Sequence, residues 1–154
     1  MSRVGRKPIP IPSGVEVNTA NQVVAVKGPK GALQWNVVSG VSVAVTDGHV
    51  QVSRASNESK MRALHGLVRA EINNMIGGVT KGYEKTLEIN GVGYKAQVQG
   101  QTMSLNVGYT HPVEFKLPKG IEAKVDKATV ITIRGIDKRL VGQVAANIRA
   151  IKRP

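Results

Sequence analysis

The sequence contains no cysteine, few aromatic residues, and 10 acidic residues against 22 basic ones. The absence of cysteine excludes a disulfide scaffold, an iron–sulfur cluster and a thiolate zinc site, and it suits a reducing compartment. No apolar run approaches the roughly 18 residues that a membrane-spanning helix needs, and prolines rather than an apolar signal segment follow the first basic residues. We therefore expect a soluble, cytosolic protein.

The composition that remains is that of a folded and strongly basic chain. Of its 154 residues 41% are hydrophobic and 21% are charged, which predicts a packed core in one domain or two small ones. A net charge of +12 attracts polyanions, of which nucleic acid is the leading candidate. An anionic membrane is the rival, but it favours cations gathered on one amphipathic helix. Here residues 1–82 carry 10 basic and 4 acidic residues and residues 83–154 carry 12 and 6, so each half has a charge of +6.

The chain contains an internal repeat at an offset of 80 residues. Residues 21–55 align without a gap on residues 101–135, and apolar residues alternate with polar ones in both segments. Such alternation, in short runs punctuated by Gly, Pro, Asn and Asp, predicts half-buried antiparallel strands, and Asp47-Gly48 predicts a hairpin turn. The identical positions are Gly28 and Gly108, Gly40 and Gly120, Val45 and Val125, Val50 and Val130, and Arg54 and Arg134.

Each set of strands is followed by a segment with helical periodicity. Apolar residues predict a first helix over about 57–76, stopped by Gly77-Gly78, and a second helix after an N-cap at Asp137. The sequence therefore predicts an α+β fold made by tandem duplication of an antiparallel β-sheet covered by one α-helix. The two repeats span residues 1–82, with a basic N-terminal arm, and residues 83–154.

Nothing in the sequence indicates an enzyme, a metal site or a cofactor. The three histidines lie in different predicted elements without metal-ligand spacing. We expect His65 at the surface boundary of the first helix, His49 in solvent, and His111 near a partner. Gly91 and Gly93 fit a loose dinucleotide-binding pattern, but a strand rather than the required helix is predicted to follow. We therefore predict no catalytic residues, no cofactor and no small-molecule substrate.

Basic residues at the two chain ends are candidate phosphate contacts. An extended, proline-rich N-terminal arm could follow a nucleic-acid backbone, although a frayed terminus is an equal alternative. Cations in the first turn of the second helix interact unfavourably with the helix dipole, and a phosphate bound at that helix end would offset this cost. The alternative is that these cations form a solvated face. The candidates are Arg3, Arg6, Lys7, Lys138, Arg139, Arg149, Lys152 and Arg153.

The tyrosines of three glycine–tyrosine pairs, all in the second repeat, form a second group of candidates together with the glycines and basic residues near them. A glycine allows a close backbone approach, and the phenol beside it can bind a phosphate or a ribose; the alternative is that the tyrosines pack at strand ends. Because the chain has few aromatic rings for base stacking, we expect duplex or otherwise structured RNA rather than single strands. The candidates are Lys81, Tyr83, Lys85, Gly91, Gly93, Tyr94, Lys95, Tyr109 and His111.

Five segments, in order along the whole chain, resemble the bacterial large ribosomal subunit proteins of the L-six family: 2–17, 26–31 (VKGPKG), 90–96 (NGVGYKA), 108–113 (GYTHPV) and 135–151. The resemblance implies a non-catalytic protein of two α+β domains that binds ribosomal RNA (rRNA), mainly through the second domain. It also implies a position near the sarcin–ricin loop and the landing site of translation factors, with other ribosomal proteins as neighbours.

The end of the sequence departs from the family pattern. Family members usually continue past a K/R-P dipeptide into a basic tail, whereas this sequence ends at Lys152-Arg153-Pro154, so weaker RNA binding is expected. The main alternative function is a general architectural protein for duplex RNA or DNA. A basic protein that associates with anionic membranes is a more distant one.

Overall fold

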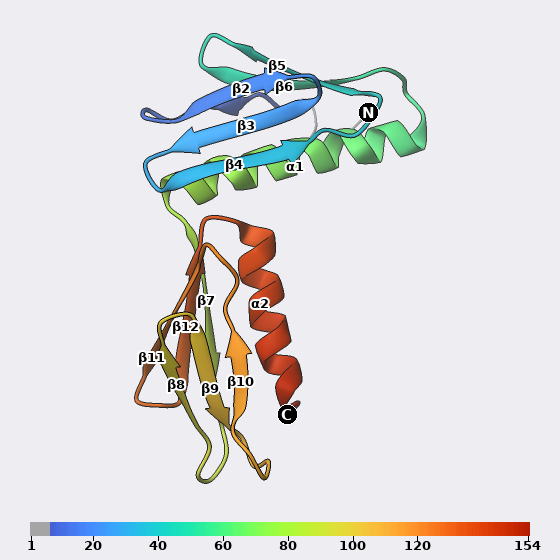
Figure 1. Cartoon of the computed structure of the whole chain (residues 1–154). Coiled ribbons are helices and arrows are strands. Elements are labelled where there is room, and N and C mark those ends of the chain that lie inside the picture. The colour runs from blue at the N-terminus through green and yellow to red at the C-terminus, as the bar shows by residue number, and fades with distance from the viewer. Residues whose placement is uncertain (1–6) are drawn as a thin grey trace. The chain divides into compact units, whose positions relative to one another are not determined.

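The computed structural model describes residues 7–154. Its contacts divide the chain into two compact units, one ending at Lys81 and the other spanning Gly82–Pro154 (Figure 1). Among the described residues, each unit contains six strands and one helix, and all strand pairs are antiparallel. The predicted α+β fold is confirmed.

Unit 1 holds two three-stranded sheets, in the strand orders β2-β3-β4 and β1-β6-β5, packed with helix α1. The predicted single sheet is therefore two small sheets. Asp47 and Gly48, both at positive φ, join β5 to β6 in the predicted hairpin. The elements are β1 (Ile9–Pro10), β2 (Glu16–Ala20), β3 (Val23–Gly28), β4 (Gly31–Asn36), β5 (Val41–Thr46), β6 (His49–Arg54) and α1 (Ser59–Thr80).

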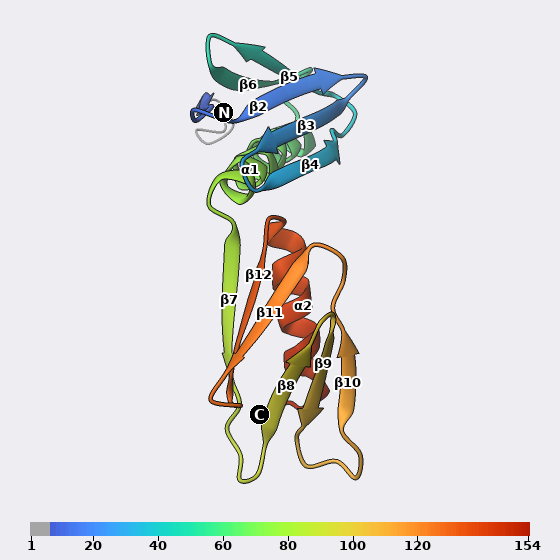
Figure 2. The same ribbon diagram turned by 60° about the vertical axis from the view of Figure 1, so that its left-hand side comes forward.

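Unit 2 repeats this arrangement strand for strand, with the orders β8-β9-β10 and β11-β12-β7 (Figure 2). The offset of 80 residues places Gly40 on Gly120, and the backbone φ angles of the two glycines are +90° and +89°. The predicted repeat is thus confirmed in backbone conformation as well as in topology. The elements are β7 (Tyr83–Glu88), β8 (Lys95–Gln99), β9 (Thr102–Asn106), β10 (Val113–Lys116), β11 (Ile121–Asp126), β12 (Val130–Gly135) and α2 (Lys138–Ile151).

Helix α1 does not stop at Gly77-Gly78 as predicted but continues to Thr80. The backbone N–H of Lys81 donates to the Gly77 carbonyl, and the Thr80 hydroxyl lies 2.7 Å from the Ile76 carbonyl. The last turn also packs on the sheet, since Val79 is fully buried and its carbonyl accepts from the Lys30 N–H. These contacts outweigh the conformational entropy that makes glycine unfavourable in a helix.

His65 is buried and not at a surface boundary, contrary to the prediction. It is 4% exposed, and its Nε2–H donates to the backbone carbonyl of Val52 on β6 over 2.7 Å. The ring thus lies between α1 and the sheet. His65 lies three residues before Val68 and seven before Ile72, so it shares the buried face of α1 with them.

Unit 2 has its own hydrophobic core beneath α2. Val141, Val144 and Ile148 of the helix are buried, as their spacing predicts, against the β-strands of the unit. Asp137 is the predicted N-cap: its carboxylate accepts from the backbone N–H groups of Arg139 and Leu140. Strand β8, rather than a helix, follows the Gly91–Tyr94 segment, so the geometry of a dinucleotide-binding loop is not formed.

Candidate nucleic-acid interface

All but one of the predicted binding residues of unit 2 fall at its two opposite ends. Strand pairing puts Tyr83 opposite Gly135 and Glu88 opposite Val130, so α2 starts beside the beginning of β7. The β7–β8 and β9–β10 loops lie at the other end, where α2 finishes (Figures 1 and 2). A helix of 14 residues is about 21 Å long. One compact ligand site therefore cannot include both the start of α2 and the loops that carry Tyr94 and Tyr109.

Tyr94 joins the two glycine-containing loops to each other. Its N–H donates to the Gly91 carbonyl over 3.2 Å, closing a turn, and its ring folds back over Gly91. A Cβ on Gly91 would lie 2.4 Å from this ring, and a Cβ on Gly108 would lie 2.9 Å from the phenol oxygen. These glycines thus make room for Tyr94, a partner within the chain, which no local pattern in the sequence indicates.

Tyr109 connects the β9–β10 loop to the end of α2. Its hydroxyl donates to the Ile151 carbonyl over 2.7 Å, and the Lys152 Nζ lies 5.0 Å from the centre of its ring. The last carbonyls of a helix have no partner within the helix, so this hydrogen bond satisfies one of them. Tyr109 is still 48% exposed. The contact spans 42 residues and has no local signal in the sequence.

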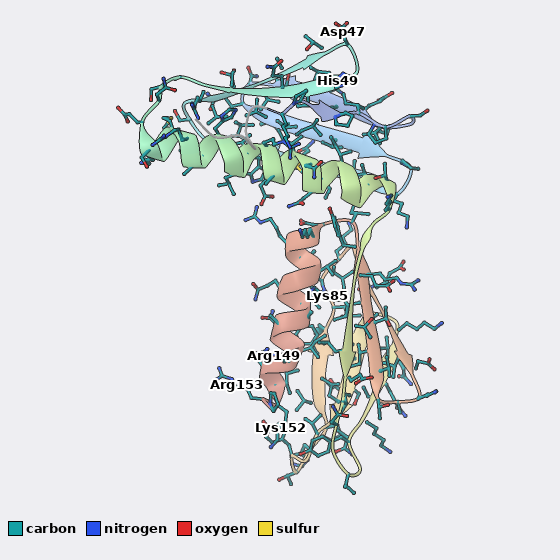
Figure 3. The ribbon with its side chains drawn as sticks, turned by 180° about the vertical axis from the view of Figure 1, so that it is seen from behind. Asp47, His49, Lys85, Arg149, Lys152 and Arg153 are labelled. Atoms are coloured by element: carbon teal, nitrogen blue, oxygen red, sulfur yellow. The ribbon has the colours of Figure 1, made fainter. Side chains whose placement is uncertain are left out.

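We call the two loops and the end of α2 the acid-free end of unit 2, comprising residues 89–95, 107–112 and 149–154. The β11–β12 turn, which directly follows Asp126, lies beside these segments, since the Ala128 carbonyl accepts from the Ala96 N–H. These three segments contain no Asp or Glu. Figure 3 shows Arg149, Lys152 and Arg153 together where α2 ends. Arg149 in the last helical turn also complements the negative end of the helix dipole. The exposed cationic residues here are Lys95, Arg149, Lys152 and Arg153, with His111 exposed beside them.

The start of α2 carries cations but also carboxylates. Lys138 and Arg139 are exposed, and the Lys138 Nζ lies 5.7 Å from the centre of the Tyr83 ring. Burial raises the pKa of the Tyr83 phenol above its usual 10.0, because burial disfavours the charged phenolate. The Asp137 carboxylate already occupies two of the helix N–H groups, and Glu84 pairs with Arg134 over 2.8 Å. The start of α2 is therefore less favourable to a phosphate than the three segments without acids at the other end of unit 2.

The remaining candidates are not part of either group. Lys85 is exposed on β7 between the two ends (Figure 3). Lys81 is exposed directly after α1. Arg3 and Arg6 lie outside the described residues. Lys7 is exposed, and its carbonyl accepts from the Arg69 Nε–H over 3.2 Å. From Ile9 onward the predicted arm is held in the fold, because β1 pairs with β6 and Ile9 is 1% exposed.

Residues 7–154 offer neither a metal site nor a membrane-spanning helix. Within this range, no group of three or more His, Asp or Glu side chains could hold a metal ion. No helix there is long and apolar enough to cross a membrane.

Two copies of a small α+β unit, with an acid-free cationic end built from loops and a helix terminus, have the features of a nucleic-acid-binding protein. Comparison with known sequences is more specific. The family model described as ribosomal protein L6 matches this chain twice, over residues 11–82 and 90–154, which is once in each unit. The chain belongs to the ribosomal protein L6 family.

Similar proteins from several bacteria carry the name large ribosomal subunit protein uL6. The protein of Geobacter metallireducens is 52% identical over the whole chain, which covers 86% of that protein. Those of Clostridium novyi and Thermodesulfovibrio yellowstonii are 55% and 54% identical, also over the whole chain, with 87% and 86% of their lengths covered.

Proposed function

We propose that this chain is a structural constituent of the large ribosomal subunit in the cytoplasm, where it binds rRNA without catalysing a reaction. Family membership supports the assignment to the ribosome, since the relatives are named as proteins of the large subunit. The finer placement, near the sarcin–ricin loop and the landing site of translation factors, follows from the sequence resemblance. Neighbouring ribosomal proteins are the other partners we propose.

The acid-free end of unit 2 is the observation on which the proposed RNA contact rests. Lys95, Lys152 and Arg153 are exposed there, and the contacts of Tyr94 and Tyr109 hold the segments that carry them. Such cations bind phosphates and fix the register of a protein on folded RNA. We therefore propose residues 83–154 as the main rRNA-binding domain, with residues 1–82 as a second surface.

Salt-dependent binding to deproteinised large-subunit rRNA tests this proposal. Equal masses of unrelated duplex RNA and of duplex DNA serve as competitors. We expect a preference for the rRNA that persists at physiological salt, because shape and 2′-OH contacts add to the charge term. Equal affinity for all three polymers, disappearing as salt rises, would instead support a general duplex-binding architectural protein.

Paired substitutions locate the contact on unit 2. Lys152→Ala with Arg153→Ala should weaken binding and reduce the slope of log K against log salt by about 0.7 to 0.9 for each phosphate that is no longer neutralised. Lys138→Ala with Arg139→Ala tests the start of α2 in the same way. The control is Lys116→Ala with Lys124→Ala, which removes the same charge from exposed positions on β10 and β11 outside both groups. If the control pair weakened binding as much as the first pair, a diffuse charge effect would replace the proposed site.

A further inference from the structure

Val92 is a fully exposed apolar side chain at the acid-free end of unit 2. It stands in the middle of the Gly91–Tyr94 turn, in the loop between β7 and β8. The large exposed hydrophobic residues in the described part of the chain are Val45, Leu67, Val92 and Tyr109, and Val92 is the most exposed of them. Its side chain therefore contributes nothing to the core of unit 2.

The turn holds Val92 in a fixed position. The Tyr94 N–H donates to the Gly91 carbonyl, and Gly93 has a φ of +78°, as the third residue of a type II turn does. The Tyr94 ring packs over Gly91 and reaches Gly108 in the neighbouring loop, which braces the turn from behind. A contact made by a preorganised side chain costs little conformational entropy on binding.

Folding gives no reason for a valine at this position. Turns favour Gly, Pro, Asn, Asp and Ser, and Val92 precedes β8 and so lies outside the alternating pattern of a strand. Single exposed apolar residues are common on protein surfaces and need no function by themselves. Val92 differs in its surroundings: Lys95 follows it closely in the chain, and Tyr94 links its turn to the loop of Tyr109, over which Lys152 lies.

We propose that Val92 is an apolar contact to RNA, packing against the exposed face of a ribose or base in the wide, shallow minor groove of a folded segment. This inference rests on the proposed rRNA binding and deepens it. The surrounding charge favours RNA as the partner of Val92, since the cations of the acid-free end would hold the phosphates on either side. The cations supply affinity that depends on salt, and Val92 supplies affinity that does not.

The test is the binding of Val92→Ser to deproteinised large-subunit rRNA over a range of salt concentrations, in the full chain. We expect Kd to rise about tenfold, as removing most of the burial of one valine side chain implies, with an unchanged slope of log K against log salt. Val92→Leu, which keeps an apolar side chain, should bind within about threefold of the parent on the same reasoning. Because Val92 packs on nothing in the unit, Val92→Ser should unfold at the same urea concentration as the parent.

Val45→Ser is the matched control, since Val45 is a partly exposed valine on β5 in unit 1. It should leave rRNA binding unchanged. If Val92→Ser bound rRNA as tightly as the parent, the inference would be wrong. The proposed function would still hold in that case, provided that the parent prefers rRNA to the competitors. A changed salt slope in Val92→Ser would also overturn it, because the substitution would then act through the cations. Normal rRNA affinity with failed incorporation into reconstituted subunits would overturn it in favour of a protein contact.

Discussion

At the scale of single residues, His65 is the buried polar side chain of the described chain, and it joins a helix to a strand. Its Nε2–H donates to the Val52 carbonyl on β6, while Val68 and Ile72 on the same face of α1 make apolar contacts only. A buried carbonyl without a donor carries an uncompensated desolvation cost. The ring therefore fixes where α1 lies along β6 more specifically than apolar packing can.

Replacing His65 with leucine should destabilise unit 1. The substitution leaves the Val52 carbonyl buried without its donor, which costs about 1–3 kcal/mol. Urea unfolding followed by far-UV circular dichroism measures the change. His49→Leu is the control, because His49 is exposed and should change stability by less than about 0.5 kcal/mol. Equal effects of the two substitutions would show that the buried hydrogen bond contributes nothing.

Tyr83 should ionise at a pH above its usual value of 10.0, because burial disfavours the phenolate and so raises the pKa. The folded state then binds the Tyr83 proton more tightly than the unfolded state does. The resulting stability is fully present below pH 10 and is lost as the pH rises through the raised pKa. Alkaline titration of tyrosinate absorbance, with Tyr83→Phe as the reference, isolates this group. A difference between the two curves centred at or below pH 10 would contradict the prediction.

At the scale of elements, two glycines at equivalent places in the repeat are required for different reasons. A Cβ on Gly28 would lie 2.7 Å from a methyl group of Val79, so this glycine lets α1 approach the sheet. A Cβ on Gly108 would instead meet the phenol of Tyr94. One position of the repeated unit thus serves helix packing in the first copy and loop packing in the second.

Gly28→Ala should destabilise unit 1 by about 1–3 kcal/mol, because Val79 and its backbone carbonyl are too close to move aside easily. Gly142→Ala is the matched control in a helix. A Cβ there meets nothing within 4 Å, so alanine should stabilise α2 by about 0.5–1 kcal/mol. Urea unfolding compares both variants with the parent. If both variants changed the free energy of unfolding equally and in the same direction, secondary-structure propensity and not close packing at Gly28 would explain the effect.

Local patterns in the sequence predicted the elements but not how their ends are grouped. Alternating residues located β3 and β5, and Asp137 located the start of α2, because each depends on neighbours along the chain. The separation of Lys138 from Tyr109 depends on strand pairing across the unit, and the hydrogen bond from Tyr109 to Ile151 spans 42 residues. Candidate binding residues were therefore identified by type, whereas their division between two ends required the structure.

At the scale of the whole molecule, charge and core are distributed in different ways. Each half of the sequence carries a charge of +6, so the net field does not distinguish the repeats. The apolar side chains form two separate cores, one containing Val68 and Ile72 and the other containing Ile133 and Val144. The location of the proposed RNA contact in unit 2 consequently depends on where acids are missing, not on which half is more basic.

The two units also differ in their aromatic chromophores. Trp35, the single tryptophan, lies on β4 against the core of unit 1, whereas all three tyrosines belong to unit 2. Tryptophan fluorescence therefore reports the unfolding of unit 1 alone. Ile133→Val, which trims the core of unit 2 at a cost of about 0.5–1.5 kcal/mol, should shift the circular dichroism transition but not the fluorescence midpoint. A common shift would mean that the two repeats melt as one cooperative body.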